Sequence, residues 1–181
     1  MIKLMIPWLL FPYLVAWFGG NFAKTALAVA FFMFVLCFDN LRRGFIIECA
    51  LVICVLGMAL ASLYWPGLST FESVKLLLYG VLTVIGWSSV LLGQPFTLQY
   101  SREGVADNVC RSSEFFEINN TITKVWCMSF SINWVLAGLS LGFEAYWPVF
   151  LIGSYMSILV ASVMTEVFPE AYLSKRTLVN G

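Results

Sequence analysis

The chain has 181 residues, of which 61% are hydrophobic and only 11% are charged, and its mean hydropathy is +0.89. A soluble domain carries about 25% charged residues, so this composition indicates a membrane protein. Ten basic and ten acidic residues give a formal charge of zero, which argues against a nucleic-acid partner, because such a partner requires a clustered basic surface. The sequence contains no histidine, which excludes His-ligated haem, His-containing zinc sites and the commonest general base.

Six apolar segments are predicted to cross the membrane, since about 20 apolar residues span the hydrocarbon core. They are Leu4–Phe18, Phe22–Phe38, Phe45–Leu63, Val74–Leu92, Thr121–Gly142 and Trp147–Val167. The first segment is short and contains Pro7 and Pro12, so the alternative is five spans with an interfacial or re-entrant first segment. A cleaved signal peptide is disfavoured because the following AWFGGN lacks a small-x-small cleavage site. The sequence therefore predicts an all-α, polytopic helix bundle that forms one membrane domain over residues 1–181.

Lysine and arginine are distributed unevenly between the two sides of this topology. If the N-terminus is cytoplasmic, only Lys24 and Lys75 lie outside, and the other eight of the ten basic residues lie inside. Short cytoplasmic loops carry an excess of basic residues, so we expect an N-in, C-in orientation with residues 168–181 as a short cytoplasmic tail. The YWP sequences at residues 64–66 and 146–148 then fall on the outer side, at the depth that Trp and Tyr prefer.

Residues 93–120 form a long polar connection on the predicted cytoplasmic side, and connections of this length are usually functional or disordered. Pro95 is expected to end the fourth span, and Thr97–Glu103 to form a short amphipathic element at the headgroup level. Gly104–Asn108 is expected to form a turn. A second helix is expected to begin with Ser112 or Ser113 as its N-cap. If it continues unbroken to Gly142, its length is about 45 Å.

Ionisable residues near the predicted cytoplasmic membrane boundary form a candidate polar cluster. They are Glu48, Glu117, Lys124 and Glu166. Charged residues in membrane helices are functional candidates, because their insertion is costly. Glu117 and Lys124 are predicted to share one face of the helix that continues into the fifth span, and Asn133 lies deeper in that span. The cluster either lines a cytoplasm-facing polar pocket or makes snorkelling and salt-bridging contacts at the interface.

Small residues recur every four positions along the sixth span, at Gly153, Ser157, Ala161 and Thr165. Small residues let membrane helices approach closely. The pattern therefore predicts either the contact face of a homodimer or ordinary packing within the bundle.

The sequence lacks a Gly-rich phosphate loop, a Ser-His-Asp set, an HExxH motif and spaced metal ligands. Its five cysteines include no CxxC pair, and a free cysteine within a span behaves as a small hydrophobe. We therefore expect no metal, no cofactor and no enzymatic activity.

Two stretches resemble a known pattern, GQPFTLQYSRE at residues 93–103 and SSEFFEINNTITKVW at residues 112–126. They resemble motifs of small bacterial inner-membrane proteins that are distantly similar to the intracellular septation protein A family. The resemblance extends from Arg42 to Gly138. It departs from the pattern at Ser101, where alanine is usual, and in residues 109–113, which lack an expected Trp and Pro. It implies a protein of the bacterial inner membrane that is loosely tied to envelope maintenance or division.

The matched positions define a candidate interaction motif. Its residues are Pro95, Phe96, Gln99, Tyr100, Arg102, Glu103, Asn119 and Trp126. One hypothesis is a scaffold or modulator of a cell-envelope or membrane complex, docking through Gly93–Glu117. The alternative is a small transporter or channel with a polar path along the fifth span. An enzyme that acts on lipid is the least supported, because no nucleophile–base pair can be assembled. The expected partners are membrane lipids and either a second copy of the chain or another membrane protein.

Overall fold

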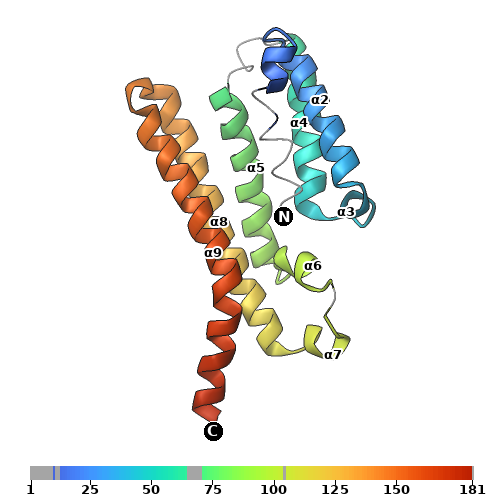
Figure 1. The fold of residues 1–181 in the computed structure, drawn as a ribbon, viewed down its shortest axis with the longest axis vertical. Coiled ribbons are helices and arrows are strands. Elements are labelled where there is room, and N and C mark those ends of the chain that lie inside the picture. Colours follow the sequence, from blue (N-terminus) through green and yellow to red (C-terminus); the bar gives the residue numbers. More distant parts are fainter. Residues whose placement is uncertain (1–9, 11–12, 65–70, 104, 181) are drawn as a thin grey trace. The chain divides into compact units, whose positions relative to one another are not determined.

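The computed structural model describes residues 10, 13–64, 71–103 and 105–180, and their regular structure is entirely helical (Figure 1). Within this part, four helices are long and apolar enough to cross a membrane. They are α4 (Ile46–Tyr64), Ser73–Leu91 of α5 (Phe71–Leu91), α8 (Ser113–Gly142) and Trp147–Ser174 of α9 (Trp147–Asn180). These helices confirm the all-α class and indicate a membrane protein. The chain divides into two compact units, Met1–Val81 and Leu82–Gly181, and α5 runs across the division.

The second predicted span, Phe22–Phe38, is shorter in the structure. Helix α2 (Phe22–Leu36) has 15 residues, about 22 Å at 1.5 Å per residue, which is less than the roughly 30 Å of the hydrocarbon core. Cys37 has non-helical φ and ψ of −107° and 14°, and separates α2 from α3 (Phe38–Arg42). The first predicted span, Leu4–Phe18, lies mostly outside the described residues. Within the part of it that is described, residues 13–17 are helical. Six spans and the N-in, C-in orientation stay predictions.

In the first unit, a tight turn leads into α2. Gly19 and Gly20 have φ of 58° and 79°, values that glycine adopts without strain. The side chain of Asn21 then caps α2 by accepting a hydrogen bond of 3.0 Å from the backbone N–H of Lys24. Helices α2 and α4 pack together. Their buried residues include Val29 and Met33 of α2 and Leu51 and Val55 of α4.

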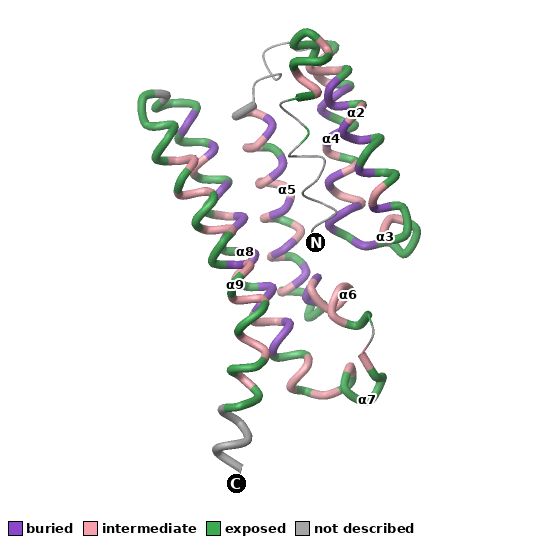
Figure 2. Tube along the Cα trace, viewed as in Figure 1, coloured by how far each residue is buried: buried purple, intermediate pink, exposed green. Residues whose placement is uncertain are grey.

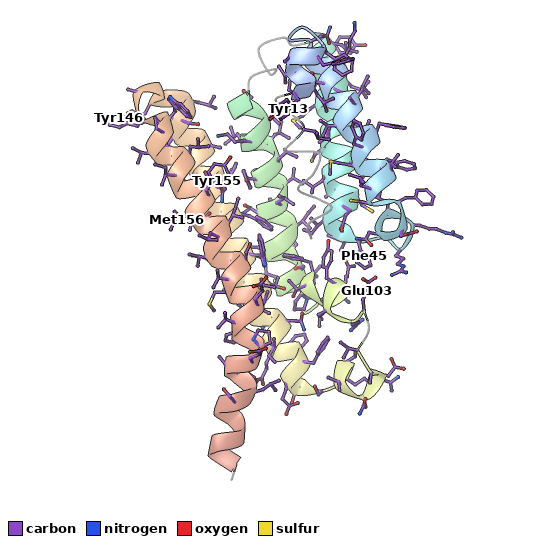
Figure 3. All side chains as sticks on the ribbon, in the orientation of Figure 1. Tyr13, Phe45, Glu103, Tyr146, Tyr155 and Met156 are labelled. Atoms are coloured by element: carbon purple, nitrogen blue, oxygen red, sulfur yellow. The ribbon has the colours of Figure 1, made fainter. Side chains whose placement is uncertain are left out.

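In the second unit, α8 and α9 form an antiparallel hairpin joined by the short helix η2 (Glu144–Tyr146) (Figure 1). Tyr146 lies at this turn (Figure 3). Two short helices, α6 (Thr97–Ser101) and α7 (Asp107–Cys110), precede α8. The long polar connection therefore contains helical elements, and α6 begins at Thr97 as predicted.

Helix α8 begins where the sequence predicts. The side chain of Ser112 accepts a hydrogen bond of 3.2 Å from the backbone N–H of Phe115, which satisfies one of the N–H groups that a helix start leaves unpaired. Glu114 lies in the first turn, where a negative charge interacts favourably with the helix dipole. The helix then continues unbroken for 30 residues, about 45 Å.

Helix α9 extends beyond the predicted span and tail boundary at Val167. It continues through Pro169 to Asn180, although proline removes a backbone donor and usually kinks a helix. The rings of Phe168 and Tyr172 lie 5.8 Å apart across this turn, and the Tyr172 hydroxyl donates a hydrogen bond to Glu117 on α8. These side-chain contacts stabilise the turn that contains the proline.

Most large apolar side chains of α9 are exposed (Figure 2). Ile152, Tyr155, Leu159 and Val163 recur every three or four residues on one face. A continuous apolar face of this kind is unfavourable in water and marks a surface that lipid or a partner covers. The face agrees with the membrane character of the chain.

Candidate functional site

The connection after α5 is fixed by a buried Pro95-Phe96 pair. Gly93 has a φ of 68°, in the left-handed region that favours glycine, and the chain turns there. The backbone N–H of Phe96 donates to Ser89 Oγ at 3.2 Å, while that hydroxyl donates to the carbonyl of Gly86 at 2.7 Å. Pro95 is among the most deeply buried residues, and Phe96 is buried. The start of the connection is therefore attached to the end of α5.

Hydroxyl groups attach α6 to α8. Thr97 Oγ1 donates to the carbonyl of Asn119 at 2.9 Å and lies 2.7 Å from Thr123 Oγ1. Since Thr97 has one hydroxyl hydrogen, Thr123 is the donor in the second bond. Ser101 Oγ donates to Asn119 Oδ1 at 2.7 Å, and Asn119 Nδ2 donates to the carbonyl of Phe115 at 2.8 Å. Asn119 and Thr123 are buried, so these bonds form in a protected setting.

Aromatic side chains join this attachment to α9. The rings of Phe96 and Phe130 stack with centroids 6.2 Å apart, and Trp126 contacts Phe130 at 5.7 Å. The indole N–H of Trp126 donates to Thr165 Oγ1 on α9 at 3.0 Å. Trp126 is 6% exposed, and a buried indole usually requires such an acceptor.

Side-chain contacts join α5 to α8 in the second unit. A Cβ added at Gly86 would lie 2.7 Å from Cys127 Sγ. One turn away, Trp87 Nε1 donates to Ser131 Oγ at 3.2 Å. Ser131, a polar residue of the fifth predicted span, therefore bonds to a neighbouring helix.

The residues of the candidate interaction motif fall into two groups. Pro95, Phe96, Asn119 and Trp126 are buried and hold α5, α6, α8 and α9 together. Gln99 and Tyr100 are half-buried, whereas Arg102 and Glu103 are exposed at the end of α6, where Figure 3 labels Glu103. The buried group explains why the motif combines proline, aromatics and asparagine. The exposed group lies at the surface of this segment.

The members of the candidate polar cluster occur in both units. Glu48, in the first unit, is 1% exposed, and its Oε1 accepts a hydrogen bond of 2.9 Å from Asn40 Nδ2. In the second unit, Glu117 accepts from the Tyr172 hydroxyl, and Lys124 and Glu166 are exposed. A single pocket that contains all four residues stays a prediction.

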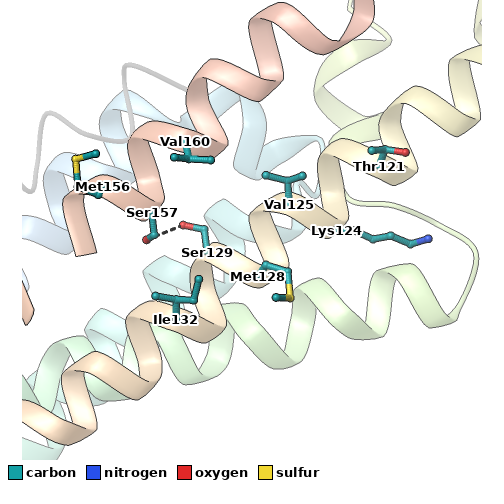
Figure 4. Close-up of a pocket in the computed structure, with 9 residues that line it drawn as sticks. All are labelled: Thr121, Lys124, Val125, Met128, Ser129, Ile132, Met156, Ser157 and Val160. Atoms are coloured by element: carbon teal, nitrogen blue, oxygen red, sulfur yellow. Dashed lines mark hydrogen bonds between the residues drawn. The ribbon is translucent and has the colours of Figure 1, made fainter. Parts of the chain in front are cut away.

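An open groove of about 450 Å³ lies between α8 and α9 (Figure 4). Its lining is mostly apolar, with hydroxyl groups and one charged residue. The lining residues are Thr121, Lys124, Val125, Met128, Ser129, Ile132, Met156, Ser157 and Val160. Among these lining residues, Lys124 is the member of the candidate polar cluster. A groove was not predicted, because its opposite wall comes from a helix whose register against α8 the sequence does not give.

A cluster of hydrogen-bonded polar side chains, centred on Ser157, lies between the same two helices. Ser157 Oγ donates to the carbonyl of Ser154 at 2.9 Å, and it accepts from Asn133 Nδ2 at 2.7 Å and from Ser129 Oγ at 3.2 Å. Asn133 Nδ2 also donates to the carbonyl of Ser129 at 2.8 Å. Asn133 is fully buried, and its Oδ1 has no donor within the described part of the chain.

The small residues of the sixth span lie in the α8–α9 contact. A Cβ added at Gly153 would lie 3.2 Å from Leu136 Cδ1, and Ala161 is 1% exposed. Ser157 and Thr165 accept hydrogen bonds from α8. This placement favours packing within the bundle over a homodimer face.

The described residues contain no cluster of three His, Cys, Asp or Glu that could hold a metal, and their five cysteines form no disulfide. No protein-family model, curated protein or solved structure matches the chain. The resemblance to the septation protein A family therefore stays a prediction.

Proposed function

We propose that the chain is a non-enzymatic, multi-pass protein of the bacterial inner membrane that scaffolds or modulates a membrane or cell-envelope complex. It would dock through the connecting segment, Gly93–Glu117, on the cytoplasmic side. The observation that carries this proposal is the attachment of the segment. Thr97 and Ser101 fix α6 to α8, while Arg102 remains exposed next to these bonds.

Attachment matters because ordering a backbone residue costs roughly 1–2 kcal/mol. A disordered segment would lose this free energy when it binds a partner. In this chain the backbone around α6 is already held in the folded protein, so an exposed side chain there can bind without that cost. Val109, 46% exposed, and Phe116, 39% exposed, add apolar surface to the same segment.

Arg102 provides the test. We expect Arg102→Glu to remove a membrane partner that co-purifies with the wild-type chain in mild detergent, and Arg102→Lys to retain part of it. Arg42→Glu is the matched control, because Arg42 is also exposed and basic but lies on α3. Mass spectrometry would compare the co-purifying proteins, and thermal unfolding would verify the fold. A wild-type chain that purifies alone, or a partner that Arg102→Glu retains fully, would contradict the proposal.

The buried, unpaired Oδ1 of Asn133 favours a second candidate function, a small transporter or channel with a polar path along α8. An unpaired oxygen inside a membrane helix is unfavourable unless a solute or water visits it. This function predicts that the reconstituted chain conducts protons or K⁺ into liposomes and that Asn133→Ala changes the flux. Liposomes with and without the wild-type chain would leak equally if the chain is only a scaffold.

A further inference from the structure

The groove between α8 and α9 is an open surface groove with the volume of a ligand site. Its volume of about 450 Å³ lies within the roughly 300–1,000 Å³ of small-molecule sites. Both walls belong to one hairpin, since residues 121–132 come from α8 and residues 156–160 from α9.

The wall of the groove favours an apolar occupant. Val125, Met128 and Val160 contribute apolar wall surface. The two serine hydroxyls in the lining are already engaged, because Ser157 donates to a backbone carbonyl and Ser129 therefore donates to Ser157. A polar ligand group placed here would find no free hydroxyl hydrogen and would lose its hydration without compensation.

The groove surface is apolar throughout, and the Lys124 ammonium extends beyond one end of it (Figure 4). Lys124 and Thr121 lie together at one end, whereas Ile132 and Met156 lie at the other (Figure 4). Lys124 is exposed, and no acidic group of the described residues neutralises it. An ammonium group beside an apolar groove is complementary to an amphiphile with an anionic head and a hydrocarbon chain.

The length of the groove matches one leaflet of a bilayer. Ile132 follows Thr121 by eleven residues along α8, about 16 Å at 1.5 Å per residue. This length is close to half of the roughly 30 Å hydrocarbon core. A second copy of the chain fits less well, because a two-fold axis along the membrane normal would place two Lys124 side chains at the same depth beside one interface.

We propose that this groove binds an anionic phospholipid from the leaflet on the Lys124 side. One acyl chain lies along Val125, Met128, Ile132 and Val160. The phosphate accepts hydrogen bonds from the Lys124 ammonium and the Thr121 hydroxyl. This inference depends on the proposed membrane placement of the chain, but it does not depend on docking through Arg102.

Native mass spectrometry of the full chain tests the proposal with two lipids of identical acyl chains, phosphatidylglycerol and phosphatidylcholine. We expect the wild-type chain to retain phosphatidylglycerol more strongly, and Lys124→Gln to lower this retention about fivefold, toward that of phosphatidylcholine. Lys24→Gln is the charge-matched control on α2. Equal retention of the two lipids by the wild-type chain would overturn the proposal.

The acyl-chain site has its own control pair. Val160→Phe fills the groove, whereas Val163→Phe adds the same bulk to an exposed position of α9 that does not line it. We expect Val160→Phe, but not Val163→Phe, to lower retention of both lipids. Inorganic phosphate that displaces phosphatidylglycerol would overturn the acyl-chain site. A wild-type dimer that Val160→Phe disrupts without lipid would assign the groove to a second copy.

Photo-crosslinking of the wild-type chain tests the same site without any substitution, so its result does not depend on whether a variant folds. Phosphatidylglycerol with a diazirine on its acyl chain should label α8 near Met128 and α9 near Val160. Labels that occur only on the outward face of α9, at Tyr155 or Leu159, would contradict the proposal. A wild-type chain that shows no lipid selectivity but keeps an Arg102-dependent partner would reject this inference and leave the proposed function intact.

Discussion

Asn119 is the residue on which the attachment of α6 depends most. Its carbonyl accepts from Thr97, its Oδ1 accepts from Ser101, and its Nδ2 donates to Phe115. The side chain therefore uses both ends of the amide while it is 3% exposed. A buried amide with partners at both ends contributes to stability, whereas loss of one partner leaves the other group unsatisfied.

We predict that Asn119→Ala lowers the free energy of unfolding by about 1–3 kcal/mol, because Ser101 loses its acceptor and a small cavity forms. The neighbouring Asn120→Ala is the matched control, since Asn120 is half-buried, and a change below about 0.5 kcal/mol is expected there. Thermal unfolding in detergent, monitored by the circular dichroism of the helices, measures the change in stability of both variants. Equal effects of the two substitutions would show that Asn119 does not hold the connecting segment.

Ser101 illustrates how a departure from the expected pattern acquires a structural role. The predicted family resemblance placed an alanine here, whereas the serine hydroxyl makes a 2.7 Å bond to Asn119. An alanine could not make this bond. The serine hydroxyl therefore strengthens the attachment of α6.

At the scale of helices, the packing of α5 against α8 depends on Gly86, which carries only a hydrogen atom where other residues carry a side chain. The space at Gly86 is filled by Cys127 Sγ, with Phe130 and Phe96 next to it. Protein interiors are close-packed and tolerate added atoms poorly. The contact therefore constrains where the connecting segment leaves α5.

We predict that Gly86→Ala lowers the free energy of unfolding by about 1–3 kcal/mol through overpacking. Adding Cys127→Ala should recover part of this loss, because the two sites share the same space and are coupled. Gly57→Ala on α4 is the control, since a Cβ there meets nothing within 4 Å and should not lower Tm. Additive losses in the double variant would exclude the direct contact as the cause.

Local sequence signals predicted where helices begin better than where they end or which other helices they contact. Ser112 specified the start of α8 because a cap acts within three residues. The extension of α9 through Pro169 was missed, because contacts with Glu117 on another helix help to hold it. The bond from Trp126 to Thr165 joins residues 39 positions apart, and the register of α8 against α9 depends on the packing of whole helix faces. The groove was unpredicted for the same reason.

For the whole molecule, the topology depends on whether the first segment and α2 cross the membrane in addition to the four long apolar helices. Helix α2 has only 15 residues, so it requires local thinning of the bilayer or flanking residues to complete a span. The uneven distribution of Lys and Arg still favours one orientation, because basic residues are retained on the cytoplasmic side. Accessible cysteines placed at predicted loops can decide between six spans and five.

We predict that, in a cysteine-free background, Lys24→Cys reacts with a membrane-impermeant maleimide in intact cells. Arg102→Cys should react only after the membrane is opened. Lys3→Cys separates the two topologies: it is protected in intact cells if the first segment crosses and labelled if that segment lies on the outer surface. Reaction of Arg102→Cys in intact cells would invert the orientation. The lipid site at Lys124 would then face the outer leaflet, and docking through the connecting segment would require a partner outside the cytoplasm.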